Sequence, residues 1–265
     1  MLARRIGLAQ PVVDALAHAY ERWDGKGHPD GLEGETVPVA VRVAAVARDV
    51  DLATTAGDDP GERLRTRRGR AYDPSVVDAF TRLRGDLLSS LDGRDEWEAA
   101  LASEPGPAMT IVPEALDGVL QAFADFADLQ SPSLRGHSRA VAALAGEAGR
   151  LTGADPAQCE RLRQAGLVHD LGRVAVENGI WDKPGSLTTT EWERVRLHPY
   201  FTERILARCE ALARLSDTAS SHHERLDGSG YHRSLPAGTQ SQRWPAERYD
   251  AKVAFDVVAR HYRNP

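Results

Sequence analysis

The chain has 265 residues, of which 42% are hydrophobic and 27% charged, and its formal net charge is −6. This composition predicts folded domains rather than disorder, and the acidic balance gives no general attraction to nucleic acid. The two cysteines, Cys159 and Cys209, stand far apart and fit a reducing compartment better than a disulfide framework. Because no apolar run approaches the roughly 20 residues that span a bilayer, and residues 1–10 lack a signal-peptide core, we expect a cytoplasmic protein with no membrane contact.

Apolar residues recur at helical spacing along most of the chain, and the alternating Val, Ile and Thr of strands are almost absent. We therefore predict an all-α fold. Residues 40–53 predict a buried helix, and Asp73 followed by Pro74 predicts the start of another. Residues 101–114 contain three prolines and predict a linker. The expected domains are therefore residues 1–100 and residues 115–265.

The second segment repeats the same helix-start signals. Asp155 and Pro156 predict a helix start, and Gly172 is the predicted end of that helix. The threonines at 188–190 predict a cap, and the acidic residues that follow suit the positive end of a helix dipole.

One short sequence occurs twice. "ERWDGKGHPDGL" spans residues 21–32 and "ERLDGSGYHRSL" spans residues 224–235, and six of the twelve positions are identical. The match indicates an internal duplication. His222 and His223 precede the second copy, whereas Ala19 and Tyr20 precede the first.

Seven of the nine histidines lie after residue 136, and five of them fall on or at the ends of predicted helices. A single histidine in a helical protein is usually a surface or satisfied core residue, and we assign His232 and His261 to that class. Together with one aspartate, the others offer the imidazole and carboxylate ligands that suit Mn, Fe or Zn. The candidate ligands are His137, His169, Asp170, His198, His222 and His223.

Four ordered blocks carry a resemblance to a known family: "GHSRAVAALA" (136–145), "GLVHDLGRVAV" (166–176), "DKPGSLTTTEWERVRLHP" (182–199) and "HHERLDGSGY" (222–231). The sequence resembles the HD-GYP branch of the HD phosphohydrolase superfamily. The first segment resembles the back half of such a domain, and the whole is similar to actinobacterial tandem-HD regulators. Those regulators often end in a DNA-binding domain, but no basic helix-turn-helix segment is visible here.

The resemblance implies an HD-domain helical bundle preceded by a degenerate, partial HD-like segment. It also implies that the six candidate ligands hold two divalent metal ions, most often Fe or Mn, with Asp170 as the bridge. A third ion would need a Glu at the position of Ser133. The implied activity is a metal-dependent phosphodiesterase or phosphohydrolase acting on a cyclic dinucleotide, cyclic di-GMP by resemblance, or on a related phosphoester.

The resemblance also suggests roles for residues around the metals. Asp170, Arg173 and Lys183 would take part in catalysis. Arg173 stands where the family has Lys, and both it and Lys183 are candidate phosphate contacts. The remaining candidate substrate contacts lie in the turn: Gly228, Gly230 and Tyr231.

Three features depart from the family pattern. The signature Gly-Tyr-Pro is Gly230-Tyr231-His232 here. The family places a further Asp ligand about 20 residues later, and Asp250, Asp256 or neither completes the site. A truncated or frameshifted gene would explain that tail. By the same resemblance, we expect the chain to begin midway through the first HD-like domain. In the first segment Arg48 takes the place of the aspartate ligand, so we expect no metal of this type there.

Several alternatives stay open. The chain could be a catalytically impaired HD module that binds a nucleotide or a protein, or a fragment that folds poorly. In a further variant, residues 1–90 complement residues 130–235. The expected partner is a nucleotide or phosphoester substrate, and a homodimer is possible.

Overall fold

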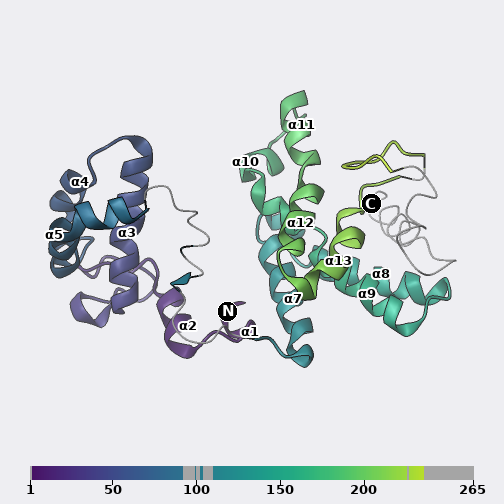
Figure 1. Cartoon of the computed structure of the whole chain (residues 1–265), viewed down its shortest axis with the longest axis horizontal. Helices are drawn as coiled ribbons and strands as arrows, with labels where there is room; N and C mark the ends of the chain where they lie inside the picture. The colour runs from purple at the N-terminus through teal and green to yellow at the C-terminus, as the bar shows by residue number, and fades with distance from the viewer. Residues whose placement is uncertain (1, 92–98, 100–101, 104–109, 226, 236–265) are drawn as a thin grey trace. The chain divides into compact units, whose positions relative to one another are not determined.

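The computed structural model describes residues 2–91, 99, 102–103, 110–225 and 227–235 (Figure 1). These residues form α-helices, short 3-10 helices and loops without a named strand, so the all-α prediction is confirmed. None of their helices is long and apolar enough to cross a membrane. The chain divides into a first unit, Ala3–Thr110, and a second unit, Ile111–Pro265. The predicted boundaries stay a prediction, although α7 begins at Pro113 and makes the last two linker residues helical.

The first segment forms short and medium helices around a small core. Val46 and Val50 pack against Leu64, Tyr72 and Val77. The helix bounds in this part are α1 (Leu2–Arg5), α2 (Gln10–Ala17), η1 (Gly34–Thr36), α3 (Val39–Ala56), α4 (Pro60–Arg67) and α5 (Pro74–Leu91).

Helix α3 matches the helix predicted over residues 40–53, but it is not buried all round. Val43 and Leu52 are each about half exposed. The predicted start of α5 is confirmed: the Asp73 carboxylate accepts a hydrogen bond from the backbone N–H of Ser75, at 2.7 Å.

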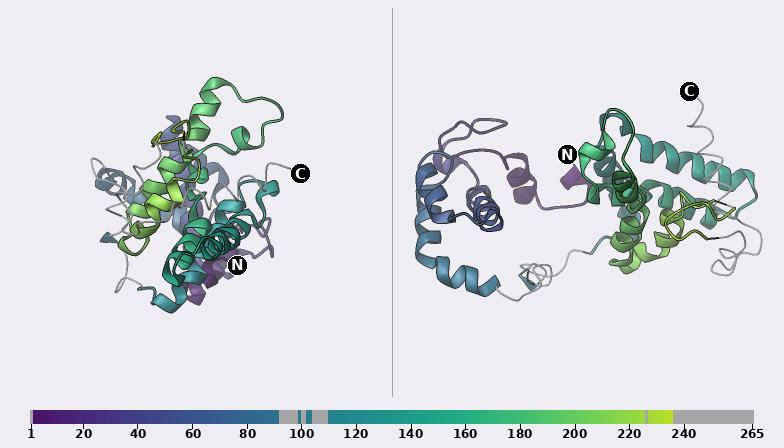
Figure 2. Two further views of the ribbon diagram at one scale, coloured as in Figure 1. Left: turned by 90° about the vertical axis from the view of Figure 1, so that its right-hand side faces the viewer. Right: turned by 90° about the horizontal axis from the view of Figure 1, so that it is seen from above.

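The second unit is a helical bundle in which α7, α8, α9, η3, α12 and α13 pack on one another. Its core includes Leu120, Ala142, Ala165, Leu206 and Leu215. In both views of Figure 2 the teal helices α8 and α9 run next to each other. The bounds are α7 (Pro113–Asp128), η2 (Pro132–Leu134), α8 (His137–Leu151), α9 (Pro156–Val168), η3 (Leu171–Ala175), α10 (Asn178–Trp181), α11 (Thr189–Arg196), α12 (His198–Ala207) and α13 (Glu210–Ser220).

The starts of α9 and α11 follow the predicted signals. Asp155 forms a reciprocal capping box with Gln158, and Thr188 forms one with Glu191. Each box satisfies backbone N–H groups that the first turn of a helix leaves without a partner.

Gly172 does not end α9, so that prediction was wrong. The helix ends at Val168, and Gly172 lies inside η3. A Cβ at Gly172 would overlap the carbonyl oxygen of His198 and the backbone nitrogen of Thr202. The missing side chain therefore lets η3 lie directly against α12, which brings the chain after α9 close to the start of α12.

Both copies of the repeated turn fold around a buried glutamate. The carboxylate of Glu21 accepts hydrogen bonds from the backbone N–H groups of Asp30 and Leu32, at 2.6 and 3.0 Å. The carboxylate of Glu224 accepts them at the same sequence offsets, nine and eleven residues later, at 2.7 and 3.0 Å. Only 3% of Glu21 and 2% of Glu224 is exposed. The duplicated sequence thus forms a duplicated hydrogen-bond pattern.

The glycines of the two turns also have matching roles. Gly25 and Gly228 both have positive φ angles, 70° and 76°, which glycine adopts readily. A Cβ on Gly27 or Gly230 would overlap the backbone of the buried glutamate and of the arginine that follows it. Each turn can therefore close only with glycine at that position.

Candidate metal centre

The six predicted ligands come together in the second unit, at the ends of four helices. His137 is the first residue of α8, His169 is the C-cap of α9, and Asp170 follows directly. His198 is the first residue of α12, and the His222–His223 pair follows α13. Helix ends allow one small space to receive side chains from four separate elements.

Asp170 lies in the middle, and its two carboxylate oxygens face different histidines. Oδ2 lies 3.4 Å from Nε2 of His169 and 3.7 Å from Nε2 of His137. Oδ1 lies 3.4 Å from Nε2 of His198 and 3.5 Å from Nε2 of His222. The donor atoms fall into two groups that could each hold a metal ion, His137–His169–Asp170 and His198–His222–His223. Asp170 therefore lies where a bridging carboxylate would lie.

Three of the rings are fixed in the same way by their own helices. Nδ1 of His169, His198 and His222 lies 2.8, 2.5 and 2.7 Å from the carbonyl oxygen three residues earlier in the chain. A carbonyl oxygen can only accept, so Nδ1 donates the hydrogen in each case. A neutral ring then has its lone pair at Nε2, as a metal-binding imidazole requires.

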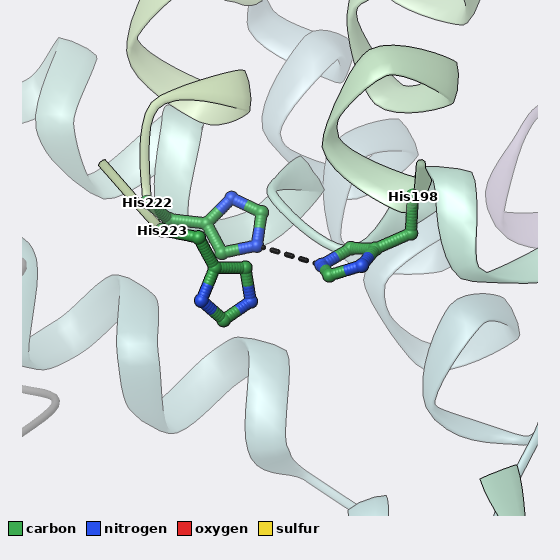
Figure 3. A group of neighbouring side chains, drawn as sticks. All are labelled: His198, His222 and His223. Carbon is green, nitrogen blue, oxygen red and sulfur yellow. Dashed lines mark hydrogen bonds between the residues drawn. The ribbon is translucent and has the colours of Figure 1, made fainter. Parts of the chain in front are cut away.

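Among the described residues, the close neighbours of these Nε2 atoms are other hydrogen-bond acceptors. Figure 3 shows the rings of His198 and His222 facing each other, with Nε2 atoms 3.0 Å apart. The Asp170 carboxylate that both rings also face offers only lone pairs when ionised. Lone pairs at such distances repel unless a cation or added protons lie among them. The donor set therefore fits a bound metal ion.

The charges at this centre support the same conclusion. Burial disfavours the ionised form of Asp170, but His169, His198 and His222 outweigh it and hold the pKa of Asp170 well below its usual range. Burial also opposes a charge on His169, yet Asp170 raises the pKa of His169. Burial lowers the pKa of His222 to about 4, so this ring is neutral near pH 7. The centre thus holds an anionic carboxylate beside the neutral His222 imidazole.

His223 and Tyr231 form a stacked pair beside the ligands. Their ring centroids lie 4.6 Å apart at an interplanar angle of 21°. Burial lowers the pKa of His223 and raises the pKa of Tyr231 to about 12, so both are neutral near pH 7. One face of the Tyr231 ring therefore supports His223, and its role in substrate binding stays a prediction.

Of the two predicted basic phosphate contacts, only Arg173 borders the cluster. Its terminal nitrogen NH1 lies 3.4 Å from Oδ2 of Asp170. Lys183 instead forms an ion pair with Glu191, with Nζ 2.7 and 2.8 Å from the two carboxylate oxygens. A phosphate contact by Lys183 would require this ion pair to open.

The turn glycines were predicted to let a nucleotide phosphate approach the backbone. The structure supplies another reason for Gly230, since the space of its missing Cβ is filled by Glu224 and Arg225. The substrate roles of Gly228 and Gly230 therefore stay predictions.

Two buried polar residues that the sequence reasoning missed support the ligands. Thr202 donates to the carbonyl oxygen of His169 and accepts from the N–H of Gly172, both at 2.9 Å. Asp128 accepts from the backbone N–H and the hydroxyl of Ser138, at 3.1 and 2.6 Å, next to His137. The four-residue spacing from His198 to Thr202, which is one helical turn, could have indicated the first of them.

The position expected for a third metal ligand carries no carboxylate. The Ser133 hydroxyl lies 2.9 Å from that of Ser131, which also donates to Asp182 at 2.7 Å. The two candidates for the final aspartate ligand, Asp250 and Asp256, lie outside the described residues.

The first unit shows no comparable cluster in the part that the structure describes. Ala19 and Tyr20 occupy the positions that correspond to His222 and His223, and the Arg48 guanidinium lies 5.8 Å from the Tyr20 ring centroid. Asp49 is buried and forms ion pairs with Arg63 and Arg67, each at 3.1 Å. Its carboxylate is therefore used to stabilise the fold.

Comparison with known proteins shows the family of the chain. A family model described as "HD domain" matches residues 1–76 and 121–241, which is most of the chain. The chain belongs to the HD domain family, in its HD-GYP branch. The HD-GYP resemblance carried by the four sequence blocks is thereby confirmed.

Several characterised HD-domain proteins are similar. The "3'3'-cGAMP-specific phosphodiesterase 3" of Vibrio cholerae is 32% identical over 239 residues, covering 88% of this chain and 52% of that protein. A "cyclic di-GMP phosphodiesterase" of Thermotoga maritima is 30% identical over 153 residues, covering 56% of this chain and 40% of that protein. This chain thus spans about half the length of these HD-domain relatives.

A solved structure shares the fold of this HD-domain chain. The crystal structure of a cyclic GMP-AMP-specific phosphodiesterase from V. cholerae superimposes with a TM-score of 0.63 at 24% identity. The superposition covers 100% of this chain and 70% of that one.

Proposed function

We propose that this protein is a metal-dependent phosphodiesterase that hydrolyses a cyclic dinucleotide. The arrangement of Asp170 carries the proposal, because its two oxygens face two separate groups of imidazole lone pairs. The names of two relatives support the substrate class, because one is called a 3'3'-cGAMP-specific phosphodiesterase and the other a cyclic di-GMP phosphodiesterase. Either dinucleotide is a candidate substrate.

We propose two divalent ions, iron or manganese, held by the groups His137–His169–Asp170 and His198–His222–His223. When bound there, two cations would polarise a phosphodiester and make a nearby water more acidic. The HD-GYP family supplies the expectation of two ions, and the position of Asp170 between the groups supports it.

The chain's own residues would bind and orient the substrate. The Arg173 guanidinium is permanently charged and borders Asp170, where it would bind a phosphate oxygen. It does not release a proton near neutral pH, so its role is electrostatic. Thr202 and the carbonyl oxygens that hold the Nδ1 atoms keep the ligand rings in place without contacting substrate.

The direct test is turnover by the purified chain loaded anaerobically with Mn or Fe. We expect hydrolysis of cyclic di-GMP or 3'3'-cGAMP to a linear dinucleotide. Anion-exchange chromatography measures the product. Asp170→Ala should abolish both activity and metal retention, whereas His232→Ala, outside both ligand groups, should retain both. A folded wild-type chain that binds metal and cleaves neither substrate would instead support the alternative of a nucleotide-binding or protein-binding module.

A further inference from the structure

The surroundings of Arg173 contain a contact that the proposed function does not use. The Arg173 guanidinium carbon lies 3.7 Å from the ring centroid of Trp181, which is a close stacking distance. The same side chain reaches Asp170 through NH1, and its Nε is buried without a protein acceptor among the described residues. The polar contacts of the Arg173 side chain therefore do not by themselves fix the orientation of its guanidinium. The stacking contact with Trp181 helps to fix that orientation.

Trp181 is itself firmly held where it meets Arg173. Its indole N–H donates to the carbonyl oxygen of Arg173 at 3.3 Å. Its ring packs beside the apolar cluster that contains Ile180 and Val195. Trp181 also meets the His198 ring edge-on, with centroids 5.6 Å apart. The indole thus fills the space between the arginine and one metal ligand.

We propose that Trp181 is a positioning residue that holds the Arg173 guanidinium flat beside Asp170, so that it can bind a phosphate of the substrate. The inference rests on the proposed function and adds a residue to it. A planar guanidinium stacks on an indole face, whereas an ammonium at this position would have no plane to stack. The Arg173–Trp181 pair therefore acts as one unit, and 16% of the Arg173 side-chain surface stays accessible to a ligand.

Phosphate affinity and a kinetic split test the pair. Trp181→Leu removes the aromatic face, and Trp181→Phe keeps one in the same apolar surroundings. For the full chain loaded with Mn, we expect Trp181→Leu to weaken inorganic phosphate binding about tenfold, which is the order of a desolvated cation–π contact. We expect KM for the dinucleotide to rise by a similar factor, with kcat changed less. Trp181→Phe should stay within about threefold of wild type, and Trp192→Leu, at an exposed tryptophan on α11, should change nothing.

A double-mutant cycle separates positioning from general damage to the fold. In an Arg173→Ala background, Trp181→Leu should have no further effect on phosphate affinity. An equal loss in both backgrounds would overturn the proposal, and so would an unchanged affinity in Trp181→Leu alone. Metal content should stay at the wild-type level in every variant, because a loss would place the effect at His198. Phosphate binding is measured without turnover. If the two residues are coupled in phosphate binding but the chain cleaves no dinucleotide, the proposed function is refuted and this inference still stands.

Discussion

The two copies of the repeated turn show how one local structure can be kept while its chemistry is lost. Residues 21–32 and 224–235 share the buried glutamate, its hydrogen bonds at two fixed offsets and the crowded glycine. They differ in the two residues just before the turn, which are Ala19–Tyr20 in one copy and His222–His223 in the other. The glutamate and the glycine therefore build the turn, and we expect the histidine pair to be necessary, but not sufficient, for a metal centre beside it.

The largest expected effect comes from giving the second turn the preceding residues of the first. We expect the double variant His222→Ala/His223→Tyr to lose one metal group and at least about 10³-fold in kcat/KM, because metal ions supply several kcal/mol of charge stabilisation. Elemental analysis and the dinucleotide assay measure the two effects.

The reciprocal variant Ala19→His/Tyr20→His serves as the matched control. We expect it to gain no metal, because the first unit has Arg48 in the neighbourhood of Tyr20 and uses Asp49 in ion pairs. An extra bound ion in this variant would show that the preceding residues alone create a site.

A smaller loss of stability is expected when the crowded glycine of either turn is replaced. Gly27→Ala and Gly230→Ala each place a Cβ against the backbone of the preceding glutamate. We expect each to destabilise its own unit by about 2–3 kcal/mol, which is typical of overpacking, as measured by denaturant unfolding. Only Gly230→Ala should also reduce metal content, because that turn directly follows His222–His223. Equal metal loss in both variants would contradict the claim that only the second turn lies beside the candidate metal ligands.

Removing the buried charge should have a more local effect. Glu21→Gln and Glu224→Gln keep the side-chain shape but weaken the hydrogen bonds to backbone N–H groups, at a cost of about 1–2 kcal/mol. Hydrogen exchange should speed up by roughly tenfold at the amides of Leu32 and Leu235, respectively. Protection that survives at Leu235 in the Glu224→Gln variant would contradict the role assigned to the glutamate.

The structure brings the six candidate ligands of the sequence together, and three of them are fixed by local contacts. His169, His198 and His222 each bond the carbonyl oxygen three residues earlier, so four short blocks contain most of the necessary information. The caps at Asp155 and Thr188 were predictable for the same reason.

Contacts between distant elements were harder to predict. Gly172 looked like a helix end, but its smallness serves the packing of η3 against α12. Lys183 looked free to bind phosphate, but its charge is paired with Glu191. The stacking of Arg173 on Trp181 likewise depends on how η3 and α10 fold together, which no local motif records.

The smallest expected effect is a pH dependence of metal binding at the candidate centre beside the second turn. We expect no such dependence at the first turn, which has no candidate ligands before it. Asp170 raises the pKa of His169 despite burial, so the metal-free centre retains a proton at pH values between about 6.5 and that raised pKa. His222, with a pKa of about 4, adds none there. A bound ion must displace the His169 proton, so affinity should rise with pH over this range and level off above it.

The slope should correspond to about one proton released per chain, or about tenfold in affinity per pH unit. Calorimetry in buffers of different ionisation enthalpy measures the proton count. A pH-independent affinity between pH 6 and 8 would be inconsistent with this arrangement.

Metal stoichiometry of the anaerobically purified full chain tests the central claim most directly. With one ion at each of the two groups around Asp170, we expect about two divalent metal ions per chain, and at most a residual amount in Asp170→Ala. Less than about one ion per folded wild-type chain, or equal metal in the two proteins, would contradict the claim that the second turn borders a metal centre.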